Sequence, residues 1–145
     1  MKRKPEKIEY YKGDYKYALK DRVEYETGIV GRGCILPLCS LTTEGLLTIE
    51  PGYAWDAPPR PTFDTPSFMR GSLVHDVLYQ MLRQPGFVED ADEHEILRHR
   101  ADLLLREICL IDGMWEWRAN WVLRGVRAGG GPSAAIKERQ VYSAP

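Results

Sequence analysis

The stretch SFMRGSLVHDVLYQMLR, which runs from Ser67 to Arg83, carries the clearest structural pattern in the chain. A helix advances by about 100° per residue, and at that spacing the apolar side chains of this stretch gather on one face. That face consists of Val74, Val77, Leu78, Met81 and Leu82. We therefore predict an amphipathic helix over these residues, with one face buried in the core.

Polar residues lie at the edge of this apolar face. His75 and Tyr79 are one helical turn apart, whereas Asp76 points well away from His75. The side chains of His75 and Asp76 can therefore have separate roles.

A second helix is predicted from about Asp92 to Ile111. Its apolar stripe consists of Leu97, Ala101, Leu104, Leu105, Ile108 and Ile111. Asp102 lies on the border of that stripe, one turn from Arg98 and one turn from Arg106. A short connection favours antiparallel packing of two helices, so we expect Asp102 to face His75 across the seam.

This pairing has a chemical interpretation and a structural one. A carboxylate beside an imidazole fixes its tautomer and stabilises its protonated form, which would make His75 a general base oriented by Asp102. Asp76, which points elsewhere, would then bind a hard cation such as calcium through oxygen. In the structural interpretation His75 is a packed or hydrogen-bonded histidine, and Asp102 forms a surface ion pair of the kind worth about 0–1 kcal/mol.

A third helix is predicted over Met114 to Arg127, closed by the glycines at 129–131. It is dominated by Trp115, Trp117 and Trp121. We expect Trp117 and Trp121, which are one turn apart, to pack on the first two helices. A ligand cage and contact with a lipid surface are the alternatives for these tryptophans.

Short strands and turns are predicted for the N-terminal part. Between Ile8 and Ile49, Tyr, Val, Thr and Ile recur in short runs interrupted by glycines. The sequence Thr42 to Gly45 is typical of a hairpin turn. The segment 51–66 is rich in proline, which blocks regular structure, so we expect a loop there. Its aromatic residues either cap the core, which we favour, or cover the start of the first long helix; they are Tyr53, Trp55 and Phe63.

Together these patterns predict an α+β protein, with short antiparallel strands and hairpins followed by a three-helix C-terminal half. We expect a single domain over residues 1–145, since a chain of 145 residues that is 43% hydrophobic can bury a substantial core. Its expected parts are a β-rich part at 1–50, a proline-rich loop at 51–66, a helical part at 67–130 and a flexible tail or arm at 131–145.

Composition excludes several classes of protein. A net charge of −1 argues against a broad nucleic-acid-binding face. No apolar stretch reaches the ~20 residues that cross a bilayer, and the charged start lacks the apolar core of a secretory signal, so we expect synthesis in the cytoplasm. The three cysteines are expected to be free thiols. His94 and His99 are five residues apart, which does not align two metal ligands on one helix face.

Several segments together resemble one protein family. They are Trp55-Asp56-Ala57-Pro58, Arg70-Gly71-Ser72-Leu73-Val74-His75-Asp76-Val77-Leu78-Tyr79, Arg100-Ala101-Asp102 and Trp121-Val122-Leu123-Arg124-Gly125-Val126-Arg127. In these segments, which lie between about Leu46 and Gly130, the chain resembles the phage-associated domain of unknown function family 1353. The resemblance implies a bacteriophage setting and no established activity.

A shorter pattern resembles the catalytic helices of phospholipase A2, including its capsid-borne parvovirus type. It consists of His75-Asp76, Tyr79 four residues after the histidine, and Ala101-Asp102 on a following helix. In that family the histidine activates water, the adjacent aspartate holds calcium and the later aspartate orients the histidine. The resemblance implies that His75 and Asp102 are catalytic with Tyr79 as hydrogen-bonding support, and that Asp76 is a calcium ligand.

Two classes of function follow. The first is a virion structural or accessory component, such as a tail or connector subunit, in which these residues form a buried polar network. Its partners would be other phage proteins or copies of this chain, and it would be made in the host cytoplasm and end in the virion. The second is a small hydrolase of the phospholipase A2 type or another metal-assisted kind. The two differ in access, because a general base at His75 needs space for a substrate.

Overall fold

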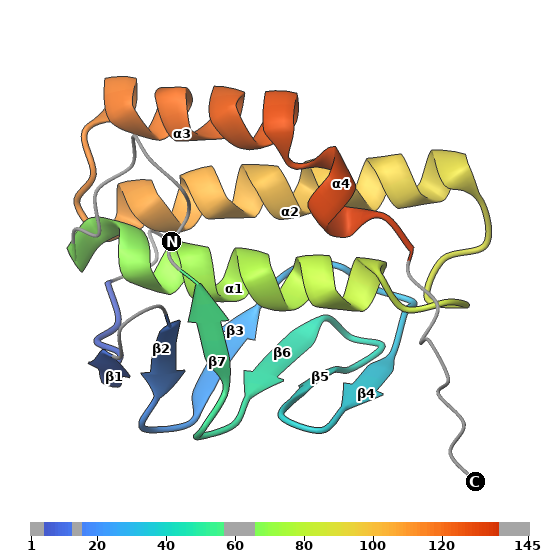
Figure 1. The fold of residues 1–145 in the computed structure, drawn as a ribbon, viewed down its shortest axis with the longest axis horizontal. Coiled ribbons are helices and arrows are strands. Elements are labelled where there is room, and N and C mark those ends of the chain that lie inside the picture. Colours follow the sequence, from blue (N-terminus) through green and yellow to red (C-terminus); the bar gives the residue numbers. More distant parts are fainter. Residues whose placement is uncertain (1–4, 13–15, 57–65, 137–145) are drawn as a thin grey trace, which may run out of the picture.

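The computed structural model describes residues 5–12, 16–56 and 66–136 (Figure 1). It confirms the predicted α+β fold, in which short antiparallel strands form two small sheets and the helices follow them in the chain. In Figure 1 the helices lie on one side of the strands.

The strands of the described residues are arranged in two separate antiparallel sheets. The first has the order β1-β2-β7, with β1 (Tyr10–Lys12), β2 (Lys16–Leu19) and β7 (Ala54–Asp56). The second has the order β3-β6-β5-β4, with β3 (Val23–Glu26), β4 (Cys34–Leu36), β5 (Cys39–Leu41) and β6 (Leu46–Ile49). β5 pairs with β6 across residues 42–45, as the predicted hairpin requires.

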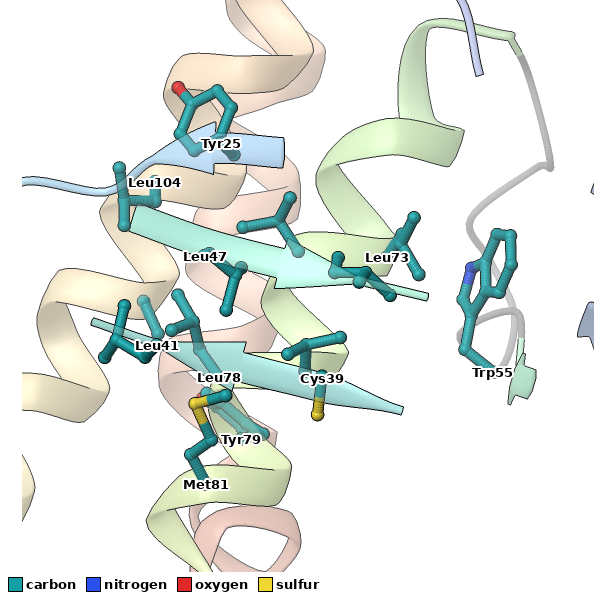
Figure 2. Packing of buried hydrophobic residues seen from close by; sticks show 14 of the residues in the cluster. Tyr25, Cys39, Leu41, Leu47, Trp55, Leu73, Leu78, Tyr79, Met81 and Leu104 are labelled. Atoms are coloured by element: carbon teal, nitrogen blue, oxygen red, sulfur yellow. The ribbon is translucent and has the colours of Figure 1, made fainter. Parts of the chain in front are cut away.

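One face of the four-stranded sheet is buried against the helices. Side chains alternate between the two faces of a strand, so every second residue points toward the core. Tyr25, Leu41 and Leu47 are among these inward residues and are at most 5% exposed. Figure 2 shows them on the same side as Leu73 and Leu78, which come from the first helix.

In the described part of the chain, four helices follow the strands: α1 (Pro66–Leu82), α2 (Ala91–Ile111), α3 (Glu116–Gly129) and the short α4 (Gly131–Ala134). α1 and α2 run antiparallel, as predicted, and α1 lies over the strands, whereas α3 lies farther from them and packs on α2 (Figure 1). The Asp90 side chain caps the start of α2 by accepting a hydrogen bond of 2.8 Å from the Glu93 N–H. Gly113, at a φ of +100°, follows the end of α2.

α1 and α2 approach each other closely at Gly71. A Cβ atom at this position would lie 3.0 Å from the Cys109 sulfur and 3.1 Å from Leu105 Cδ1, both on α2. Only glycine therefore fits this helix spacing without displacing its neighbours. Gly71 is one turn before His75, so the two helices are already close where the polar residues face each other.

Trp55 joins the three-stranded sheet to α1. Its side chain is 1% exposed, and its indole Nε1 donates a hydrogen bond of 3.1 Å to Ser72 Oγ on α1. The ring of Trp55 also lies 5.6 Å from that of Tyr17 on β2. Tyr53 is likewise buried, at 5% exposure, so both aromatic residues belong to the core, as we favoured. Phe63, the third aromatic residue of the predicted loop, lies outside the described residues.

The prediction that Trp117 and Trp121 pack on the first two helices is wrong. Trp115, Trp117 and Trp121 are 72%, 64% and 41% exposed. The buried face of α3 is formed instead by Ala119 and Val122, which join a cluster with residues of α1 and α2. At about 100° per residue these two small side chains leave Trp117 and Trp121 on the opposite face of the helix.

The structure also has regular elements where a loop and a tail were expected. β7 lies within the segment 51–66 and pairs with β2 before the group of prolines begins. α4 lies at the start of the segment 131–145, and its residue Ala134 is fully buried. Arg83 donates a hydrogen bond of 2.8 Å to the Ser133 carbonyl, and His94 Nε2 is 2.7 Å from the Ala134 carbonyl oxygen. These contacts fix a segment that has little apolar pattern of its own.

Residues 137–145, the rest of the expected tail, lie outside the described residues. Among the helices of the described part, none has the length and apolar character needed to cross a bilayer.

Candidate active site

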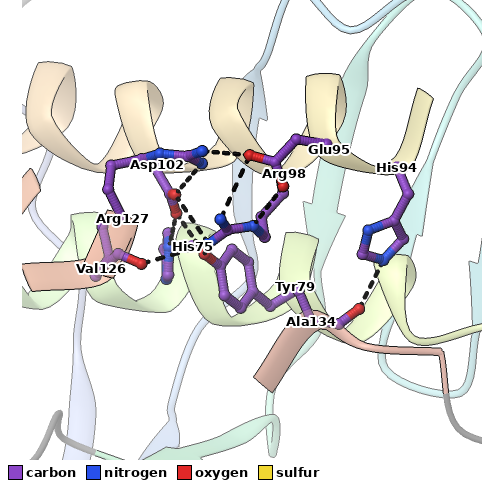
Figure 3. A network of polar contacts seen from close by, with 9 residues as sticks. All are labelled: His75, Tyr79, His94, Glu95, Arg98, Asp102, Val126, Arg127 and Ala134. Atoms are coloured by element: carbon purple, nitrogen blue, oxygen red, sulfur yellow. Dashed lines mark hydrogen bonds and ion pairs between the residues drawn. The ribbon is translucent and has the colours of Figure 1, made fainter. Parts of the chain in front are cut away.

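Asp102 on α2 is the centre of a polar network that joins three helices (Figure 3). Its carboxylate is fully buried, and its Oδ1 lies 2.7 Å from His75 Nε2 and accepts a hydrogen bond of 2.6 Å from the Tyr79 hydroxyl. Its Oδ2 accepts a hydrogen bond of 2.8 Å from Arg127 Nη1. α1 thus provides His75 and Tyr79, and α3 provides Arg127. The expected contact between His75 and Asp102 across the seam is present.

The geometry of His75 fixes its tautomer. An ionised carboxylate can only accept hydrogen bonds, so His75 Nε2 carries the proton that it shares with Asp102. The other ring nitrogen, Nδ1, has no hydrogen-bond partner among the described residues, and the side chain is 13% exposed. In the neutral imidazole Nδ1 therefore presents a lone pair that can accept a proton.

Hydrogen bonds keep Asp102 ionised in spite of its burial. Burial alone would raise the pKa of this carboxyl, but the hydrogen bonds from His75, Tyr79 and Arg127 outweigh burial and hold the pKa below its ordinary value. Arg98 adds a second guanidinium, since its Nη1 is 3.7 Å from Oδ2. The carboxylate is therefore a fixed negative charge beside the His75 imidazole.

The carboxylate of Glu95, two turns before Asp102 on α2, balances the two guanidiniums. Glu95 accepts a hydrogen bond of 3.0 Å from Arg98 Nε, and it also accepts one from Arg127 Nη2. Both arginines are therefore held between two carboxylates, Glu95 near the surface and Asp102 in the interior. This arrangement has the alternating charges that a buried ion pair needs in order to be stable.

Tyr79 is held in place from two sides. Burial, and next the neighbouring Asp102, raise the pKa of Tyr79 well above its ordinary value, so the phenol remains a donor. Its ring packs on the His75 ring at a centroid distance of 4.1 Å. On the other side is Gly130, at the end of α3, where a Cβ atom would lie 2.7 Å from the Tyr79 hydroxyl. Tyr79 therefore supports both the position of the imidazole and the charge of the carboxylate.

Asp76 belongs to a different polar group, on the side of α1 that faces the strands. Tyr53 OH donates to Asp76 Oδ2 at 3.3 Å and to Gln80 Oε1 at 2.8 Å. Burial raises the pKa of Asp76, and the nearby Arg83 and the hydrogen bond from Tyr53 only partly oppose this. The structure thus confirms that Asp76 and His75 point to different surroundings.

The described residues around Asp76 do not fit a calcium ion. Calcium takes six to eight oxygen ligands and prefers ionised carboxylates among them. The calcium–oxygen distances are about 2.3–2.6 Å. The Asp76 carboxylate has a raised pKa and contacts a phenol that is itself a hydrogen-bond donor. Over residues 5–12, 16–56 and 66–136 no three His, Cys, Asp or Glu side chains converge as metal ligands. The role of Asp76 as a calcium ligand therefore stays a prediction.

Other candidate residues lie apart from this network. His94 binds the Ala134 carbonyl, whereas His99 is exposed, so the structure does not bring the two histidines together. The cysteines are free thiols, and burial raises the pKa of Cys39 to about 11 and that of Cys109 to about 12. These two thiols are therefore poor nucleophiles at neutral pH.

A cavity of about 470 Å³ lies between the start of α2 and α4. Arg98 is one of its lining residues, and His75 is not among them. Arg98 is thus the residue shared by this cavity and the network, since its Nη1 is also 3.7 Å from Asp102 Oδ2.

Arg127 and Glu95 are the members of the network that the sequence did not indicate. Arg98 is one turn from Asp102 on the same helix, so its contact follows from helical spacing. Arg127 is on α3, and no spacing within one helix relates it to Asp102. The signal that could have found it is the position of Arg127 directly after Val126, which packs against the buried cluster of α3. That signal is useful only if the buried face of α3 is known. The prediction that Trp117 and Trp121 form the buried face pointed to the wrong side of the helix.

No protein family model matches this chain, and no curated protein or solved structure matches it. The resemblances to the phage-associated family and to phospholipase A2 therefore stay predictions.

Proposed function

We propose that this protein is a small hydrolase in which His75 acts as a general base on water, with an ester or amide carbonyl as the substrate group. The observation that carries the proposal is the state of the His75 ring: Nε2 is held 2.7 Å from a buried, ionised Asp102, while Nδ1 has no protein partner among the described residues. A general base needs one nitrogen fixed and the other able to take a proton.

The proposed reaction begins with a water molecule at His75 Nδ1. The water proton passes to Nδ1, the water oxygen forms a bond to the carbonyl carbon, and the carbonyl electron pair moves to its oxygen. The fixed charge of Asp102 stabilises the imidazolium that results. Collapse of the intermediate expels the alcohol or amine, which takes the proton back from Nδ1. General-base catalysis of this kind contributes roughly 10²–10⁴-fold in rate.

The test compares hydrolysis by the parent protein with that by His75→Ala, Asp102→Asn and the control His99→Ala, which removes an exposed histidine from α2. The substrates are p-nitrophenyl esters of different chain lengths and vesicles that contain a fluorogenic phospholipid, each with calcium and with a chelator. We expect the parent and the control to hydrolyse at least one substrate, and the two site variants to lose about 100-fold or more in kcat. Absence of hydrolysis by the parent, or full activity in His75→Ala, would contradict the proposal.

We also propose a second function, a structural or accessory role in a virion as a tail or connector subunit, because one observation favours it. Trp117 and Trp121 are exposed on α3, and Trp115, the residue directly before the helix, is exposed beside Trp117. Exposed tryptophans are uncommon on a protein without partners and are enriched in protein interfaces. The partners in this proposal are copies of this chain or other phage proteins.

Light scattering at increasing protein concentration tests the second proposal. We expect the parent protein to self-associate and the double variant Trp117→Ser, Trp121→Ser to stay monomeric at the same concentration. Flotation with lipid vesicles provides the comparison, since tryptophans also favour membrane interfaces. Binding of the parent to vesicles without self-association assigns this face to lipid and contradicts the structural role.

A further inference from the structure

We infer that Arg127 is a positioning residue of the proposed site: from α3, it holds the Asp102 carboxylate in the orientation that leaves Oδ1 to His75. This inference rests on the proposed hydrolase function. The sequence predicted a site formed by the first two helices. With Arg127, α3 also contributes a residue to this site.

The contacts of the two Asp102 oxygens carry the argument. Oδ2 accepts the 2.8 Å hydrogen bond from Arg127 Nη1, whereas Oδ1 accepts from Tyr79 and from His75. Each carboxylate oxygen therefore has its own donors. If the carboxylate rotated by half a turn, Oδ1 would face Arg127 and Oδ2 would face His75. The guanidinium fork fixes direction as well as charge, which a single ammonium does less well.

Arg98 does not provide the same restraint, although it is closer in sequence. Its Nη1 is 3.7 Å from Oδ2 and is shared with the Val126 carbonyl at 3.4 Å and the Tyr79 hydroxyl at 3.5 Å. Its Nε is bound to Glu95. Arg127 is thus the guanidinium with the direct hydrogen bond to Asp102, and Glu95 holds its other nitrogen.

Arg127 must also affect the proton affinity of His75. Among the described residues, the charged or titratable groups that interact with His75 are Asp76 and Tyr79 from α1 and Asp102 from α2; Arg98 and Arg127 contact Asp102, and Glu95 contacts both arginines. The positive charge of Arg127 opposes protonation of the nearby imidazole, and the negative charge of Glu95 favours it. Removal of either charge should therefore shift the His75 pKa, in opposite directions.

The experiment is an NMR titration of the imidazole resonances in the full-length protein, with His75→Ala used to assign His75 among the three histidines. The variants are Arg127→Gln, Arg127→Lys and Glu95→Gln. The control is Arg124→Gln, which removes an exposed arginine one turn earlier on the same helix. We expect Arg127→Gln and Glu95→Gln to move the titration of the His75 resonances in opposite directions, and the control to leave it in place.

The conservative variant separates positioning from charge. Arg127→Lys keeps the positive charge, so we expect a nearly unchanged His75 pKa, but it loses the fork geometry, so we expect kcat to fall by roughly 10-fold with KM little changed. A His75 pKa that is the same in all Arg127 and Glu95 variants overturns the inference. Equal kcat in Arg127→Lys and the parent also overturns it.

The two proposals can fail separately. The titration needs no substrate, so it tests the link between Arg127 and His75 even if the parent hydrolyses nothing, a result that would overturn the hydrolase proposal alone. If Arg127→Gln does not fold, Glu95→Gln provides the test, because it changes the charge without removing a donor to Asp102. A rise in the His75 pKa of Glu95→Gln contradicts the inference.

Discussion

Replacement of Asp102 by Asn gives the most direct test of the network. Asn keeps the shape of Asp but has one acceptor oxygen and one amide group that donates. With its oxygen toward His75 and Tyr79, the amide would face Arg127, and two groups of donors would meet. With the opposite orientation the oxygen accepts from Arg127, but the amide donates toward His75 Nε2, so the ring proton must move to Nδ1. Neither orientation of Asn restores both the contacts and the negative charge of Asp102.

The size of the effect can be worked out from these contacts. Loss of one hydrogen bond to a charged group costs about 1.5–3 kcal/mol, and removal of one partner from a buried ion pair costs about 3–5 kcal/mol. Arg127 is 29% exposed and keeps its contact with Glu95, so water and Glu95 offset part of the loss. We therefore expect a loss of about 3 kcal/mol in the free energy of unfolding. For a domain of this size that corresponds to a decrease in Tm of about 6–12 °C.

Urea unfolding and thermal unfolding at neutral pH measure this change. The control is Glu107→Gln, which removes an exposed carboxylate from the same helix and should alter the unfolding free energy by less than about 0.5 kcal/mol. The double variant Asp102→Asn, Arg127→Gln should be less destabilised than the sum of its parts, because both changes break the same contact. A loss below about 1 kcal/mol for Asp102→Asn, or strict additivity with Arg127→Gln, would refute the reasoning.

Three further outcomes are expected. Gly71→Ala should destabilise the protein by about 1–3 kcal/mol in urea unfolding, because its Cβ would press on the Cys109 sulfur. Gly125→Ala, in open space on α3, should instead stabilise the protein by about 0.5–1 kcal/mol. Equal effects of the two variants would contradict the close packing at Gly71. Because Asp102 has a lowered pKa in the folded state, its contribution to stability is present above the unfolded pKa of about 4 and is lost as the pH falls through the folded value. Acid unfolding should therefore be steeper in the parent than in Asp102→Asn, and identical profiles would be inconsistent with an ionised carboxylate. Asp76 has a raised pKa, so its contribution is present at low pH and is lost as the pH rises through the folded value. Asp76→Asn should thus increase Tm at neutral pH, by less than Asp102→Asn decreases it, and a decrease would count against the assigned environment.

The helices of this protein could be predicted from sequence because their apolar spacing is long and regular. The predicted helices at 67–83 and 92–111 differ from α1 and α2 by a residue at each end at most. The contact between His75 and Asp102 followed from two such stripes and a short connection. The pairing of strands into two sheets did not follow, because strands of three or four residues carry too little pattern to determine their partners.

The rotation of α3 was the main error, and it had a physical cause. Tryptophan is the largest apolar side chain, so Trp117 and Trp121 suggested the buried face. In the structure that face is made of smaller residues, Ala119 and Val122, because α3 packs on α2. The same rotation of α3 places Arg127 beside Asp102. The wrong prediction of the buried face of this helix therefore also left Arg127 out of the predicted site.

The convergence of three helices on Asp102 has a consequence for local opening of the protein. If the last turns of α3 separated from α2, Asp102 would lose the hydrogen bond from Arg127, and this loss disfavours the opening. Amide protons near Arg127 should then exchange with deuterium more slowly in the parent protein than in Arg127→Gln. Apolar contacts of Ala119 and Val122 attach the first half of α3, whereas an ion pair at the proposed catalytic centre attaches its last turns.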